Sequence, residues 1–445
     1  MKIKHIAICL LTISVLVTSL PTYAYASNPV TDTFKFEKVD LDLLHEVKLL
    51  DERFEKEGLV YHNQTLEAYL DRVGNSVVRD KQLENVEWKF RILRDPSPNA
   101  FALPNGSIFI NTGLLGLIDD ESQLAAVLAH EVVHVSKRHT YQQNRSLRKK
   151  ILAINIFTTI GNLNPVAGSV GAVISIVAGI SPLMLAISIF GYSRDLEREA
   201  DKEGLNLMTA AGYAPEGMVN SFKALQRDIE GEFFHTFYSD HPKLQERVSY
   251  TSSAISPTAK KFSEEEAKAA RSDYLTIMET VDRHDIDLAL NEARFRSAVY
   301  VGKKLLDLHP DSSTNVFLLA EGYRMLGPRA ADPATKETTS SGKKDAAKFR
   351  SKRTLEEQET ELLKTPEGQQ AWKSNAQEAE RLYRMALELD RFNAVAHRGL
   401  GMLFEKLGRK EEAASEYSKY LELQPNAVDS ERFRRRMKLL RDSMQ

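Results

Sequence analysis

Cysteine is almost absent from this chain of 445 residues, and the single one, Cys9, lies within its first ten positions. The same end has the pattern of a secretory signal peptide: two lysines, an uncharged apolar run, and the small-x-small sequence Ala24–Tyr25–Ala26. We therefore predict a signal peptide over residues 1–26 and export of the chain that begins at Ser27. That mature chain would have no thiol, so core packing, a metal or partners must stabilise it without disulfides.

The chain also lacks a strong net charge. It carries 60 basic and 62 acidic residues, a net charge of −2. Removal of residues 1–26 takes away two lysines and leaves 58 basic against 62 acidic residues, a net charge of −4. No basic field favours nucleic acid, and we expect no nucleic-acid partner. The composition, 42% hydrophobic and 27% charged, is that of a globular protein, and the length allows two or three domains.

Residues 151–193 contain no charged residue at all. The segment is long enough to span a membrane, but glycine, asparagine and proline interrupt it repeatedly. Membrane insertion is one interpretation. We favour an apolar helical hairpin, either buried or dipping into a membrane surface, which could give the protein a peripheral membrane contact.

The spacing of apolar residues predicts a mainly α fold with a small β-sheet in the first part of the chain. Residues 86–93 and 107–111 alternate as strands do, and the proline-rich stretch between them predicts a loop. A helix is expected to begin near Asp119–Glu121, where acidic residues suit the positive end of the helix dipole. Further helices are predicted over residues 41–58, 65–80 and 193–208, and a turn followed by a helix over 237–250.

The C-terminal part contains an internal repeat. Residues 379–390 superpose on 413–424 at an offset of 34, which is the tetratricopeptide period, and residues 293–327 form a more distant copy. We predict an all-α repeat domain over residues 271–327 and 371–445, with the charged stretch 328–370 as a flexible insertion. Ordinary amphipathic helices are the alternative. The matched positions are Ala379 and Ala413, Tyr383 and Tyr417, Leu387 and Leu421, and Leu389 and Leu423.

The stretch HEVVH, residues 130–134, indicates a metal site. His130 and His134 are four residues apart, so on a helix both imidazoles lie on one face and can reach the same ion. Glu131 lies beside the ion without binding it and is the candidate catalytic base. The alternative is a histidine-rich helix that matches this pattern by chance.

A catalytic zinc needs a third protein ligand. His139 is five residues beyond His134 with no glycine between them, so on a continued helix it would point away from the pair. Glu197 is the better candidate, because Asp201 follows one helical turn later and could orient a ligating histidine. Glu199 is the rival ligand, and a solvated acidic helix face is the alternative. Two imidazoles and one carboxylate favour zinc, one Zn²⁺ per chain.

Four motifs, HEVVH, SRDLEREAD, NAFALPNG and HPKLQER, together resemble the HtpX-like and CaaX-prenyl-protease metallopeptidase family. The closest likeness is to its exported branch with C-terminal tetratricopeptide repeats. The resemblance implies a gluzincin fold for a zinc metalloprotease domain over residues 27–270. It supports the metal ligands His130, His134 and Glu197 and the base Glu131.

The resemblance also places His241 near the metal, as a fourth ligand that blocks water or as a donor to the transition state. The family usually has a hydroxyl residue before that histidine, and this chain has Asp240, which leaves the role open. Alternatively, His241 caps the following helix. Arg194 and Arg247 match family arginines and could bind carboxylates around the site or form surface pairs.

These features predict an exported zinc metalloendopeptidase that hydrolyses unfolded or misassembled envelope proteins in the periplasm, with membrane association as a further expectation. Residues 107–111 could pair with an extended substrate, and the repeats could dock a protein partner such as an outer-membrane assembly machine. The main alternative is a chaperone or adaptor that acts through its repeats and has a latent protease site. A membrane-embedded prenyl-protein protease and an export-compartment scaffold are further rivals.

Overall fold

The structure, a computed structural model, describes residues 34–79, 82–146, 192–226, 244–256, 263–331 and 354–444. The expected signal peptide, residues 151–191 of the apolar segment, and His241 lie outside the described residues. Within the described ranges, no helix is both long and apolar enough to cross a bilayer.

A three-stranded sheet forms the centre of the first domain. Its strands are β1 (Lys89–Leu93), β2 (Ala100–Ala102) and β3 (Ser107–Asn111), in the order β1-β3-β2. β3 pairs with β1 in parallel and with β2 in antiparallel register. Neighbouring strands therefore occupy both edges of β3 and leave no free edge for a substrate. The expectation that residues 107–111 pair with a substrate is wrong. β2 is one of the two outer strands of the sheet, and it lies in the stretch expected to be a loop. The sequence did not predict this strand because three residues between prolines carry too little alternation.

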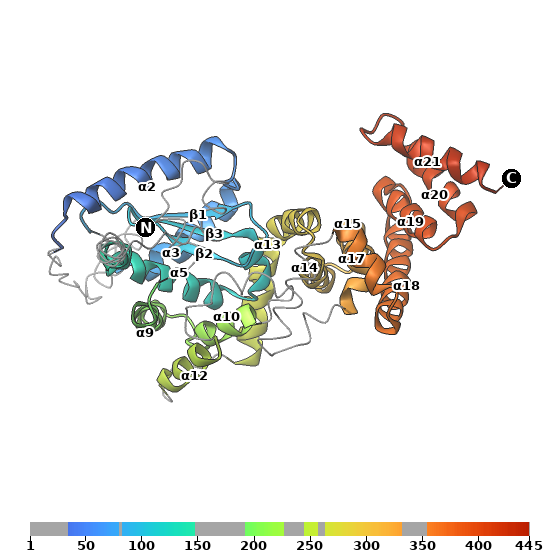
Figure 1. The fold of residues 1–445 in the computed structure, drawn as a ribbon. Helices are drawn as coiled ribbons and strands as arrows, with labels where there is room; N and C mark the ends of the chain where they lie inside the picture. The colour runs from blue at the N-terminus through green and yellow to red at the C-terminus, as the bar shows by residue number, and fades with distance from the viewer. Residues whose placement is uncertain are drawn as a thin grey trace, which may run out of the picture.

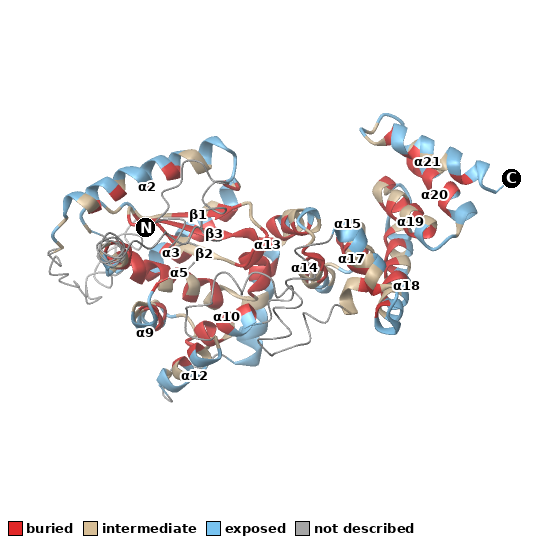
Figure 2. Cartoon of the chain, in the orientation of Figure 1, coloured by how far each residue is buried: buried red, intermediate tan, exposed pale blue. Residues whose placement is uncertain are grey.

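The two faces of β3 are covered by different helices, as Figure 1 shows. Phe109 packs with residues of α2 (Lys38–Lys56) on one face. Ile108 and Ile110 pack on the other face with residues of α3 (Gln64–Val77) and α5 (Glu121–Ser136). Buried residues concentrate on the sheet and on α5, whereas the outer side of α2 is exposed (Figure 2). The prediction of a mainly α domain with a small sheet is confirmed.

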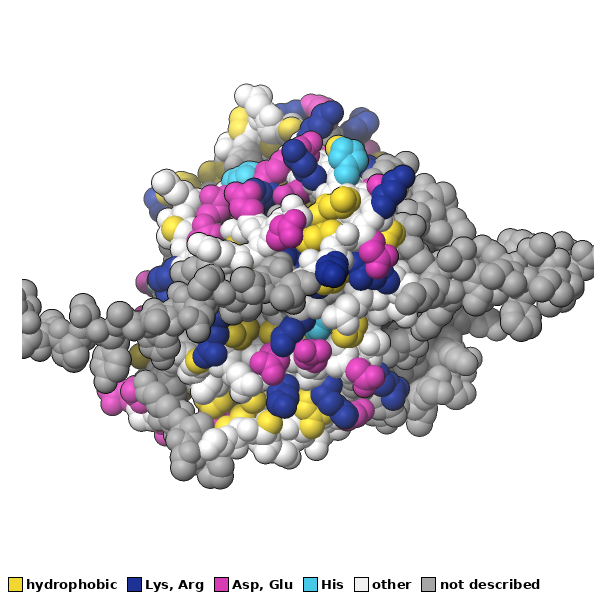
Figure 3. Space-filling view, turned by 90° about the vertical axis from the view of Figure 1, so that its left-hand side faces the viewer, with side chains coloured by type: hydrophobic (Ala, Val, Ile, Leu, Met, Phe, Trp, Pro, Cys, Tyr) yellow, Lys and Arg dark blue, Asp and Glu magenta, His cyan; other side chains and the backbone are white. Residues whose placement is uncertain are grey.

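The remaining helices of this domain are α4 (Thr112–Leu117), α9 (Arg194–Ala210), α10 (Glu216–Gln226) and α12 (Leu244–Ala254). At the end of the molecule away from the repeats, acidic and basic side chains are interspersed over the described surface (Figure 3).

The predicted domain boundary after residue 270 falls inside a continuous helix, α13 (Glu264–Asn291). Tyr274 and Met278 of this helix belong to the core around the sheet. Ile286 and Ala289 pack with α14 (Phe295–Leu308) and α15 (Ser313–Leu326). The boundary was misplaced because one amphipathic helix serves both cores, with no break in its apolar pattern. α13 therefore joins the two parts directly.

The C-terminal part consists of helices packed one after another, which extend away from the sheet in Figure 1. Ala379 and Ala413 are both fully buried, as are Tyr383 and Tyr417. Equal burial at matched positions is what a 34-residue structural repeat requires, and the tetratricopeptide assignment stays a prediction. The helices are α14 (Phe295–Leu308), α15 (Ser313–Leu326), α18 (Pro366–Leu389), α19 (Ala394–Lys406), α20 (Lys410–Leu423) and α21 (Ser430–Asp442).

The described parts of the insertion predicted over residues 328–370 are largely helical. A 3-10 helix covers Gly327–Ala331, α17 covers Leu355–Leu362, and α18 begins at Pro366. Thr354 and Glu357 form a capping box at the start of α17, and Thr365 caps α18. These capping signals start helices in a stretch whose charged composition alone suggested flexibility.

Candidate metal centre

The candidate site is built on α5, a helix buried on nearly all sides. The side chain of Asp120 caps its first turn by accepting a hydrogen bond from the backbone N–H of Gln123 at 2.9 Å. Three turns later, His130 and His134 lie on the same side of the helix. Their Nε2 atoms are 3.0 Å apart.

Glu197 reaches these histidines from α9. This helix can come close to α5 because Gly204 has no side chain: a Cβ atom there would lie 3.1 Å from the backbone nitrogen of His130. The Glu197 carboxylate lies 3.5 Å from Nε2 of His130 and 3.8 Å from Nε2 of His134. The structure thus brings together the three ligands that the sequence predicted.

The geometry of this cluster fits a metal ion. One ligand atom from each of the three residues lies within 4.8 Å of the others. In a tetrahedral zinc site with bonds of about 2.0–2.1 Å, neighbouring ligand atoms are roughly 3.4 Å apart, close to the separations seen here. Two imidazole nitrogens and one carboxylate form a donor set suited to zinc, and three protein ligands leave one coordination position open.

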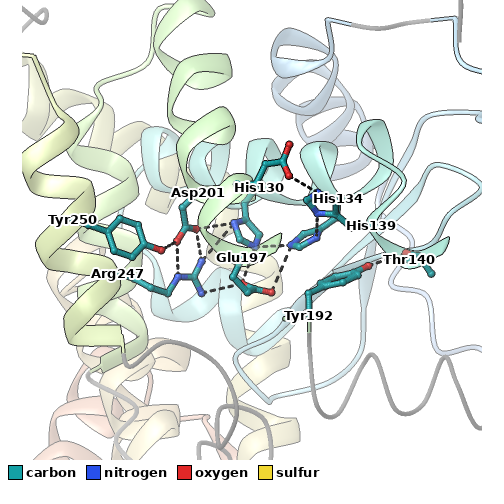
Figure 4. A network of polar contacts seen from close by, with 10 residues as sticks. His130, His134, His139, Thr140, Tyr192, Glu197, Asp201, Arg247 and Tyr250 are labelled. Carbon is teal, nitrogen blue, oxygen red and sulfur yellow. Dashed lines mark hydrogen bonds and ion pairs between the residues drawn. The ribbon is translucent and has the colours of Figure 1, made fainter. Parts of the chain in front are cut away.

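A buried polar network holds His130 in place, as Figure 4 shows. The Nδ1 atom of His130 lies 2.9 Å from Oδ1 of Asp201, the role predicted for that aspartate. Arg247 of α12 donates to both Asp201 oxygens, at 2.9 and 2.6 Å, and its Nη1 lies 3.6 Å from Glu197. Arg247 is only 4% exposed, so the surface-pair alternative is wrong for this residue. Tyr250, which the sequence did not single out, also donates to Asp201.

The electrostatics of the cluster favour a positive charge at His130, whereas burial and the neighbouring His130 lower the pKa of His134. Burial opposes the protonation of His130, but hydrogen bonds to Asp201 and Glu197 outweigh it and raise the pKa of the ring to about 10. Burial would raise the pKa of Asp201, but Arg247 and His130 outweigh it and keep that pKa below its ordinary value. A site that attracts a proton this strongly also attracts a metal cation, and the two compete for the same nitrogen.

Glu131 lies beside the cluster and is not one of its three ligands. Its side chain is buried, with 8% of the residue exposed, and the backbone N–H of Ala102 on β2 donates to it. Burial raises the pKa of its carboxyl to about 7. A carboxylate with a pKa near neutrality is suited to accept and return a proton.

The sequence predicted that His139 would point away from the other two histidines, but the structure places it beside His134. α5 ends at Ser136, and Arg138 adopts a left-handed backbone with φ of 60°. This turn brings His139 back, so that its Nδ1 lies 2.9 Å from Nδ1 of His134. The expectation failed because it assumed a continued helix, and the chain turns here without a glycine.

Tyr192 also contacts a ligand of the site, and the sequence did not predict this contact. Its ring stacks on His134 with the centroids 3.9 Å apart and the planes at 14°, and its hydroxyl shares a 2.8 Å hydrogen bond with Thr140. The only sequence signal was a tyrosine immediately before the predicted helix at 193–208, which carries no information about stacking.

Two other candidates lie outside the ligand cluster. Arg194 is exposed on the first turn of α9 and takes no part in the polar network of the described residues. Glu199, the rival ligand, has its carboxylate 3.5 Å from Nε2 of His139 and therefore faces that ring. The role of His241 stays a prediction.

The part of the chain that contains the three ligands and Glu131 is similar to known proteins. Residues 64–255 match Peptidase family M48. The chain therefore carries a peptidase family M48 domain. The family resemblance drawn from the sequence motifs is confirmed for this part of the chain, which contains the whole metal cluster.

Several curated proteins are similar to parts of the chain. The mitochondrial metalloendopeptidase OMA1 of Schizosaccharomyces pombe is 32% identical over 121 residues, which is 26% of this chain and 35% of OMA1. The putative beta-barrel assembly-enhancing protease of Vibrio cholerae is 35% identical over 80 residues, which is 18% of this chain and 16% of that protein. Its Escherichia coli counterpart is 34% identical over 74 residues, 17% of this chain and 15% of that protein. The chain thus covers about a third or less of the length of each of these relatives.

Proposed function

We propose that this protein is a zinc-dependent metalloendopeptidase. The observation that carries the proposal is the position of Glu131: a buried carboxylate beside three convergent metal ligands and outside the ligand set. A site that served only to hold a structural metal would not need an acid there. Zinc bound by His130, His134 and Glu197 would supply Lewis-acid catalysis.

The chain's own residues account for the proton transfers. Glu131 takes the proton of the attacking water and then delivers it to the leaving amine. A hydrogen bond from the backbone N–H of Ala102 favours the ionised form of the Glu131 carboxyl. Because burial raises the pKa of Glu131 to about 7, the carboxylate can both accept and release the proton near neutral pH.

The edge strand β2 is the proposed place for an extended substrate. Backbone hydrogen bonds from Asn111 N to Asn99 O and from Leu103 N to Ser107 O, both facing β3, flank this strand. The intervening Ala100 and Ala102 therefore direct their backbone groups outward, and the N–H of Ala102 already reaches Glu131. A peptide paired along this edge lies beside the base and the metal ligands, whatever its sequence.

We further propose that the substrates are unfolded or misassembled proteins, that the protein acts in the periplasm, and that its repeat helices bind a partner. Pairing through the main chain selects extended segments, which unfolded or misassembled proteins expose and folded proteins do not. The predicted signal peptide supports export to the periplasm, and two of the similar proteins are named for beta-barrel assembly. The repeat helices would then dock a partner, such as an outer-membrane assembly machine. A chaperone with a latent protease site is the alternative.

A matched pair of substrates tests the proposal. We expect the chain from Ser27 to Gln445 to cleave reduced, carboxymethylated ribonuclease and to leave native ribonuclease intact. The cleavage should disappear in Glu131→Gln and persist in Glu121→Gln, a change on the same helix three turns from the site. Equal cleavage of both substrate forms would contradict the substrate class. No cleavage by the wild-type chain, with zinc bound, would favour the chaperone alternative.

A further inference from the structure

Described residues contact both nitrogens and one face of the His134 ring. Its Nε2 faces the ligand cluster, and its Nδ1 lies 2.9 Å from Nδ1 of His139. Tyr192 stacks on one face of the ring. His134 is 1% exposed and His139 is fully buried, so no bulk water reaches the contact between them.

The chemistry of imidazole fixes which of these nitrogens carries a proton. A metal on Nε2 of His134 uses that lone pair, so the Nδ1 of the neutral ring carries the hydrogen and must donate it. Nδ1 of His139 is the acceptor at 2.9 Å. His139 then carries its own proton on Nε2, which lies 3.5 Å from a carboxylate oxygen of Glu199. Glu199 lies near this N–H without forming a hydrogen bond to it, so the hydrogen bond between the two rings is the contact that orients His134.

We propose that His139 is a positioning residue that fixes the tautomer and orientation of the metal ligand His134, with Glu199 behind it. The inference rests on the proposed metal site and goes beyond it, because it assigns a role to a residue outside the ligand set. The two ligating histidines are held differently: Asp201 accepts from His130, and a neutral imidazole accepts from His134. Because a group that orients a ligand contributes to metal affinity, loss of the acceptor at residue 139 weakens zinc binding even though no ligand is changed.

Two substitutions of similar size separate this role from packing. The side-chain oxygen of His139→Asn can take the place of Nδ1 and accept the hydrogen bond, whereas His139→Leu fills the same space without an acceptor. Zinc affinity of the full mature chain is measured by competition with a chromophoric chelator. The melting temperature of each zinc-free protein checks the fold. Tyr141→Phe, on the same turn and packed toward Phe34 and Phe36, is the control.

We expect His139→Leu to weaken zinc binding by about 10–100-fold, with His139→Asn and Tyr141→Phe within a few-fold of the wild type. Equal losses in the Asn and Leu variants, or none in the Leu variant, would overturn the positioning role while wild-type zinc binding and cleavage stand. A wild-type chain that binds no zinc would instead overturn the proposed function, and this inference with it.

Discussion

The Nδ1 atom of His130 lies 2.9 Å from Oδ1 of Asp201, and both residues are almost completely enclosed. Asp201 also accepts two hydrogen bonds from Arg247, which hold its carboxylate in the position from which it orients the His130 ring. The arrangement leaves Nε2 of His130 directed at Glu197, the third ligand. One carboxylate thus couples the packing of α9 and α12 to the orientation of a metal ligand on α5.

Removal of that carboxylate should weaken the metal site. We expect Asp201→Ala to lower zinc affinity by roughly 10–100-fold, because His130 loses the acceptor that orients its ring. Asp195→Ala, on the exposed first turn of the same helix, should leave the affinity unchanged. Chelator competition measures both variants. Equal affinity of Asp201→Ala and the wild type would show that the network does not support the ligand.

A buried and an exposed ion pair join α9 and α12, and only the buried one, between Arg247 and Asp201, should contribute strongly to stability. Arg247→Leu removes a buried cation that pairs with the carboxylates of Asp201 and Glu197, and we expect a loss of about 3–5 kcal/mol in the free energy of unfolding. Arg198→Leu removes the exposed pair with Glu246 between the same two helices, and its cost should be about 0–1 kcal/mol. Urea unfolding of the zinc-free proteins measures both, and equal costs would contradict the account.

Activity should fall as Glu131 becomes protonated. Its pKa is raised to about 7 by burial, from an ordinary value of 4.5, and a bound cation nearby would lower it again. The carboxylate is the active form, so kcat/KM is expected to decrease toward acid pH with an apparent pKa between these two values. The profile is measured with zinc content determined at each pH. A rate that stays constant down to pH 4.5 with zinc retained would argue against Glu131 as the base.

A second pH effect is expected at the junction of α13 and α4. Asp282 and Asp285 are buried and approach the same point: a Cβ atom at Gly116 would lie 3.6 Å from one carboxylate and 3.3 Å from the other. Burial raises the pKa of each to about 7. Since the folded state holds these protons more tightly than the unfolded chain, stability is highest below the ordinary pKa of 3.8 and is lost as the pH rises through about 7.

Neutral substitutions should remove that loss. We expect Asp282→Asn and Asp285→Asn to be more stable than the wild type at pH 8, with the difference shrinking toward pH 5. Asp273→Asn, exposed on the same helix, should follow the wild type at both values. Urea unfolding at the two pH values measures the effect. The same pH dependence in the wild type and in the two buried variants would contradict it.

Local patterns in the sequence were enough to predict the core of the site. The four-residue spacing of His130 and His134 and the helical setting of Glu197 and Asp201 each depend on one element. What the sequence could not show depends on how the chain turns between elements. The return of His139 requires a left-handed Arg138 where no glycine signals it, and β2 becomes a strand only because β3 lies beside it.

The role of Arg247 also depends on how helices pack, which the sequence alone does not show. Its motif marked it as a candidate, but only the contact of α12 with α9 buries it against Asp201. Tyr192 and Tyr250 carry no local signal at all, since their roles come from which ring and which carboxylate they meet. The continuity of α13 across both cores was similarly hidden, because an amphipathic helix looks alike whichever core it packs against.

Zinc removal and restoration on the mature chain, with Glu131→Gln beside it, tests the central claim most directly. The account predicts one zinc per chain in both proteins. It also predicts casein cleavage by the wild type that is lost on chelation and recovered with one equivalent of zinc, and no cleavage by Glu131→Gln at any zinc level. Absence of zinc from the wild type, or cleavage by zinc-loaded Glu131→Gln at the wild-type rate, would contradict it.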